Sequence, residues 1–96
     1  MRRAIPTLIG DQLKELFSRP DIAAKIAEGE LPETWRNVVG DAVANLTTQL
    51  QLNRRILYIS VQSAIVRNEL LYKRESLRQE LNRRSRVPII DSIIIK

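Results

Sequence analysis

The sequence predicts an α+β fold, in which helices precede a three-stranded mixed sheet. Apolar residues repeat at helical spacing up to residue 46. Two short runs then alternate at period two, and an isoleucine-rich run closes the chain after a long helical stretch. These observations give the element order α-α-α-β-β-α-β.

Two helices are predicted before residue 30. Residues 5–17 carry apolar side chains at helical spacing, with polar ones on the other face. Residues 20–27 form a second, short helix, because Pro20 suits a first helical position and Gly29 suits a C-terminal cap. Residues 30–32 are then expected to form a turn.

A third helix is predicted over residues 32–46, where apolar residues follow the i, i+3, i+4, i+7 pattern from Trp35 onward. Gly40 lies within this helix, where glycine costs about 1 kcal/mol relative to alanine. We therefore expect another backbone to pack closely against Gly40.

The remaining elements form the sheet and its crossover. Residues 46–52 and 56–61 alternate apolar and polar side chains across a short connection, which indicates an antiparallel hairpin. One long helix is predicted from its N-cap Ser63 to Arg84. The run 89–95 is then a strand, and it should lie parallel to 56–61 because a helical crossover joins them.

Composition restricts the chemistry that the chain can perform. It has 96 residues, so we expect one domain over 1–96, with a helical preface at 1–30 and a core at 31–96. Cysteine and histidine are absent, which excludes disulfides, thiolate metal sites and imidazole catalysis. We expect no enzyme activity, cofactor or metal site. The sequence lacks the roughly 20 apolar residues of a membrane span, so a cytoplasmic protein without a membrane partner is expected.

Positive charge is concentrated in the second half of the chain. Residues 1–52 carry six basic and seven acidic side chains, a net charge of −1. Residues 53–96 carry ten basic and four acidic side chains, a net charge of +6. Such a half favours nucleic acid or an acidic protein surface as its partner.

Several motifs resemble the DciA-like family. They are Trp35-Arg36-Asn37-Val38-Val39-Gly40, the run 57–64, Asn68-Glu69-Leu70 and Leu81-Asn82. The resemblance covers residues 31–96. It implies a K-homology-like domain that recruits or loads the bacterial replicative DnaB-type helicase. The resemblance also implies nucleic-acid binding as an additional activity. Relatives often carry a further extension or a zinc ribbon, which this cysteine-free sequence does not show.

Candidate partner-binding residues are mainly arginines. Arg83, Arg84 and Arg86 cluster at the end of the long helix, although cations there also interact favourably with the helix dipole. Further candidates are Arg67, Arg74 and Arg78, which lie close together on a helical wheel, Arg54 and Arg55 at the hairpin, and Tyr72 on the polar side of the long helix. The arginines of the long helix have an alternative interpretation, in which their aliphatic stems cover the edge of the core. For Arg54 and Arg55 the alternative is an ordinary solvent-exposed turn.

Three functions are consistent with this pattern. The first is a non-enzymatic replication adaptor that binds the replicative helicase and also DNA. The second is a general nucleic-acid-binding module. RNA binding by a K-homology groove is disfavoured, because Gly10, Gly29 and Gly40 provide no Gly-x-x-Gly pair. The third is a protein-interaction or homodimeric domain, in which the exposed edge of the sheet adds a strand from another chain.

Overall fold

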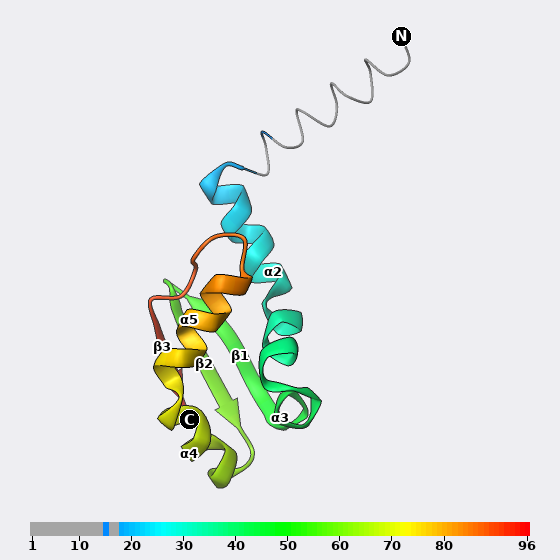
Figure 1. The fold of residues 1–96 in the computed structure, drawn as a ribbon, viewed down its shortest axis with the longest axis vertical. Helices are drawn as coiled ribbons and strands as arrows, with labels where there is room; N and C mark the ends of the chain where they lie inside the picture. Colours follow the sequence, from blue (N-terminus) through cyan, green and yellow to red (C-terminus); the bar gives the residue numbers. More distant parts are fainter. Residues whose placement is uncertain (1–14, 16–17) are drawn as a thin grey trace.

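The computed structural model describes residue 15 and residues 18–96, and it confirms the α+β class with a three-stranded mixed sheet (Figure 1). The predicted helix over 5–17 lies outside the described residues, apart from Glu15. The elements are α2 (Pro20–Val39), α3 (Asp41–Leu46), β1 (Thr47–Asn53), β2 (Ile56–Val61), α4 (Ala64–Tyr72), α5 (Arg74–Arg84) and β3 (Ser92–Ile95).

The sheet has the order β1-β2-β3, with β1 antiparallel and β3 parallel to the central strand. Leu57 pairs with Leu52 on one side and with Ile93 on the other. The predicted hairpin and parallel crossover are therefore confirmed. The last strand is shorter than predicted, because residues 89–91 precede it without joining the ladder.

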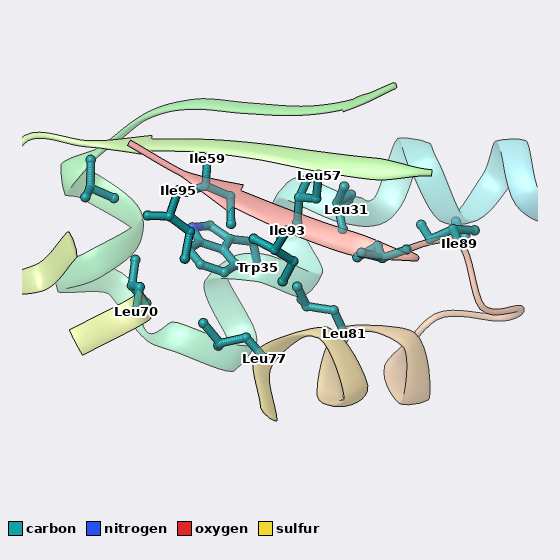
Figure 2. Packing of buried hydrophobic residues seen from close by; sticks show 13 residues of the cluster. Leu31, Trp35, Leu57, Ile59, Leu70, Leu77, Leu81, Ile89, Ile93 and Ile95 are labelled. Carbon is teal, nitrogen blue, oxygen red and sulfur yellow. The ribbon is translucent and has the colours of Figure 1, made fainter. Parts of the chain in front are cut away.

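A single hydrophobic core lies between the sheet and the helices (Figure 2). Trp35 of α2 is 2% exposed and packs between the strands and α5. Its indole Nε1 donates a hydrogen bond to Thr47 Oγ1 at 3.0 Å, and that hydroxyl donates to the Val43 carbonyl at 2.9 Å. The tryptophan thus joins α2, α3 and the start of β1 while its polar atom remains satisfied.

The helix α2 is continuous where two helices and a turn were predicted. Pro32 lies inside it, although an interior proline costs about 3 kcal/mol. Ala23, Ala27, Leu31 and Trp35 are all buried at a spacing of four residues, so one helix places a single apolar stripe on the core. Burial of this stripe outweighs the proline, and the predicted turn was wrong.

Gly40 ends α2 and does not lie within a helix. Its φ of 90° and ψ of 165° belong to a region that is essentially restricted to glycine. A Cβ built at this position meets nothing within 4 Å, so the expected close backbone approach was wrong. Glycine is required here by backbone conformation, because the chain turns sharply from α2 into α3.

The predicted long helix is divided at Lys73, whose φ of −100° and ψ of 16° end α4 and precede α5. The N-cap prediction is confirmed, since Ser63 Oγ accepts a hydrogen bond from the Val66 amide at 3.2 Å. Residues 71–76 are all exposed, so no side chain around the interruption at Lys73 packs into the core. Leu70 of α4 and Leu77 of α5 can therefore pack on the core from two separate helices (Figure 2).

Candidate binding surfaces

Five of the predicted binding arginines pair with carboxylates in the structure. Glu80 accepts from both Arg83 and Arg84, with N–O distances of 2.5 and 2.6 Å. Arg78 forms a forked contact with Glu75. The other two pairs are Arg86 with Glu30, at 3.4 Å, and Arg55 with Asp91, at 3.0 Å.

These contacts alter the proton affinity of the acidic partners. Hydrogen bonds from Arg83 and Arg84 lower the pKa of Glu80 from 4.5 to about 2. The hydrogen bond from Arg78 is the main cause of the lowered pKa of Glu75. Both carboxylates are stabilised in their charged form, which is the opposite of what a general acid needs near neutral pH.

Three of the predicted arginines, Arg54, Arg67 and Arg74, have no carboxylate within 4.0 Å among the residues that the structure describes. They lie on the hairpin turn, on α4 and at the start of α5, respectively. Because Lys73 interrupts the helix, Arg67 lies on α4, whereas Arg74 and Arg78 lie on α5. Their grouping on one helical wheel assumed a continuous helix, which the structure divides.

An apolar groove, which sequence reasoning missed, lies where the end of α2 and α3 face α4. Its volume is about 310 Å³, and Glu69 and Lys73 are its charged members. Ile65 on α4 contributes one wall and is 78% exposed. The other apolar lining residues are Val38, Val39, Val43, Val66, Leu70 and Leu77.

Tyr72, which stays a predicted partner contact, extends this apolar surface along α4. It is 89% exposed and lines a shallow hollow with Ile65, Asn68 and Glu69. Ile65 and Tyr72 are seven residues apart, so they lie on the same face of α4. The available sequence signal was Ile65 itself, an apolar residue outside the Val66–Leu70 stripe.

The described residues provide neither a metal-site cluster nor a membrane-spanning helix. Within residues 15 and 18–96, no group of three or more acidic side chains is placed to hold a metal ion. No helix in this part of the chain is long and apolar enough to cross a membrane. The surface instead combines an apolar groove with exposed cations.

Comparison with known proteins identifies the family. Residues 8–95 match the family described as Dna[CI] antecedent, DciA, and the chain belongs to this family. A UPF0232 protein of Mycolicibacterium smegmatis (strain ATCC 700084 / mc(2)155) is 32% identical over 75 residues, which cover 71% of this chain and 39% of that protein. A UPF0232 protein in the recF-gyrB intergenic region of Mycolicibacterium smegmatis is also 32% identical, over 68% of this chain and 34% of its own length.

The chain therefore spans between a third and two fifths of the length of these relatives. No solved structure gives a significant match, so the likeness to a K-homology fold stays a prediction. The family resemblance itself is confirmed. The DciA family is associated with loading of the DnaB-type replicative helicase.

Proposed function

We propose that this chain is a non-enzymatic adaptor of bacterial DNA replication that binds the replicative DnaB-type helicase. The family match over residues 8–95 carries the proposal, because the family is associated with helicase loading. The binding activity is proposed for this domain alone, since the relatives are more than twice as long as the aligned part.

The apolar groove and the adjoining Ile65–Tyr72 face of α4 are the proposed helicase-binding surface. Ile65 and Tyr72 are the two most exposed large apolar side chains among the described residues. Ile65 lines the groove, and both line the shallow hollow on α4. Exposed apolar surface beside a groove is typical of protein interaction sites, where tyrosine is enriched. Most of the arginines near the end of α5 have carboxylate partners within the domain, so they contribute less to such a contact.

The test is a quantitative pull-down against the replicative helicase of the same organism, with Ile65→Ala as the variant. Loss of this contact is expected to weaken binding about tenfold, which corresponds to about 1.4 kcal/mol of binding free energy. Folding should be unaffected, because an exposed side chain away from special features contributes within about 0.5 kcal/mol.

Ile94→Ala is the matched control, because Ile94 is also an exposed isoleucine, 39% exposed, but lies on β3 outside the groove. It should bind the helicase like the parent chain. No association of the parent chain at micromolar concentration would reject the adaptor function. Equal binding by both variants would reject only the proposed surface.

Nucleic-acid binding is a second proposed activity. It is favoured by the +6 charge of residues 53–96 and by Arg54, Arg67 and Arg74, which lack a carboxylate partner among the described residues. Binding to duplex DNA should weaken with salt, with log K falling against log salt by about 0.9 per phosphate contact. Gel-shift titration at several salt concentrations measures this slope. A flat salt response would contradict the activity.

A further inference from the structure

The hairpin turn between β1 and β2 contains two arginines in an unfavourable backbone conformation. Arg54 has a φ of 52° and Arg55 a φ of 67°, and they are the only non-glycine residues with positive φ in the described part of the chain. Positive φ at both central positions is the signature of the type I′ hairpin turn, in which Asn-Gly is strongly preferred. For other L-residues this region is disfavoured by contact between Cβ and the following carbonyl oxygen.

Interactions within the domain account for the conformation of Arg55. Its carbonyl oxygen accepts a hydrogen bond from the Asp91 amide at 2.7 Å. Its side chain pairs with the Asp91 carboxylate, at 3.0 Å, and donates from Nη1 to the Pro88 carbonyl at 3.2 Å. Arg55 therefore ties the turn to the segment that precedes β3, and these contacts offset the strained backbone.

Arg54 has no comparable contacts. Its side chain is exposed and takes part in no ion pair or side-chain hydrogen bond that the described residues provide. Arg54 lines a surface hollow of about 230 Å³, and Glu28 of α2 lines it as well. The Glu28 carboxylate is nevertheless more than 4.0 Å from the Arg54 guanidinium. Nothing within the described domain explains why arginine, and not asparagine or glycine, occupies this position.

We propose that Arg54 is a phosphate contact for nucleic acid, presented by a turn that Arg55 holds in place. The proposal rests on the nucleic-acid binding proposed above and names the residue that carries it. A strained residue without an internal role is a reason to look for function. The planar guanidinium suits a forked contact with phosphate oxygens, and the exposed side chain of Arg54 leaves it accessible to them.

The decisive variant is Arg54→Asn, because asparagine tolerates positive φ while it removes the guanidinium. Its melting temperature should equal or exceed that of the parent chain, since the preferred turn residue relieves strain. Its affinity for duplex DNA should nevertheless fall, and the slope of log K against log salt should become shallower by about 0.9 for one lost phosphate contact. A stabilised chain that binds less tightly separates a binding role from a structural one.

Lys96→Gln is the matched control, because it removes one positive charge from an exposed side chain at the opposite end of the sheet, where the Lys96 backbone pairs with Ile59 and Val61. It should leave the slope unchanged. Equal slopes for Arg54→Asn and the parent chain, or an equal loss in the control, would overturn the proposal while leaving DNA binding in place. Absence of binding by the parent chain at low salt would overturn the DNA-binding function itself.

Discussion

Asn82 at the end of α5 holds the segment that leads into β3. Its side-chain Oδ1 accepts hydrogen bonds from the Ile89 and Ile90 amides, both at 3.0 Å. Its Nδ2 donates to the Ile90 carbonyl at 2.8 Å. One side chain therefore satisfies three backbone groups beside two buried isoleucines, which gives the Leu81-Asn82 motif a structural role.

Replacing Asn82 with alanine should destabilise the domain by about 2–3 kcal/mol, because part-buried amide groups lose their acceptor. Chemical denaturation measures this change. Asn82→Asp provides the comparison, since it keeps the acceptor for both amides and loses only the donor. A cost for alanine below that of aspartate would contradict the assigned role.

Glu80 makes the domain sensitive to acid. Its pKa is about 2 in the folded chain and 4.5 as the reference value, so the carboxylate stabilises the fold above pH 4.5. This contribution is lost as the pH falls from about 4.5 to about 2. A nuclear magnetic resonance titration of the Glu80 carboxyl carbon should give a midpoint near 2, and Glu80→Gln should remove this part of the acid transition. A midpoint near 4.5 would show that the contacts with Arg83 and Arg84 do not persist in solution.

At the scale of elements, Gly40 determines where α2 ends. Gly40→Ala should destabilise the domain by about 1–3 kcal/mol even though the site has open space, because the cost comes from the backbone conformation. Thermal unfolding measures the loss. Ala42→Gly in the adjacent exposed helix is a useful contrast, because there glycine is the less favourable residue, by about 1 kcal/mol. A neutral Gly40→Ala would show that the turn accepts another conformation.

The sequence predicted the strands more accurately than the helix boundaries, for a physical reason. In residues 56–61 the alternation of side chains follows the alternation of buried and partly buried positions, and β2 has the predicted bounds. Pro32 and Gly40 are ambiguous, because each is compatible with a start, an interior or an end of a helix. Tertiary packing of Leu31 and Trp35 makes the helix continue through Pro32. Local helix propensity contains no information about that packing.

At the scale of the whole molecule, five of the arginines that the sequence offered to a partner are paired with carboxylates within the domain. The Glu80–Arg83 and Glu80–Arg84 pairs could have been read from their spacing of three and four residues. Arg86 and Glu30 are 56 positions apart, so only the fold reveals their contact. The groove was equally hidden, because its walls come from helices that meet only in three dimensions.

The wall formed by α3 has a different character from the rest of the groove. This helix has six residues and none of them is buried, whereas α4 and α5 opposite are anchored by Leu70 and Leu77. Val43 and Ala44 of α3 pack against the core but are only partly buried, so less apolar surface holds this wall than holds the wall opposite. The proposed helicase-binding surface thus has one wall held by buried leucines and one held by partly buried side chains, and we expect the second to adjust more readily to an incoming protein.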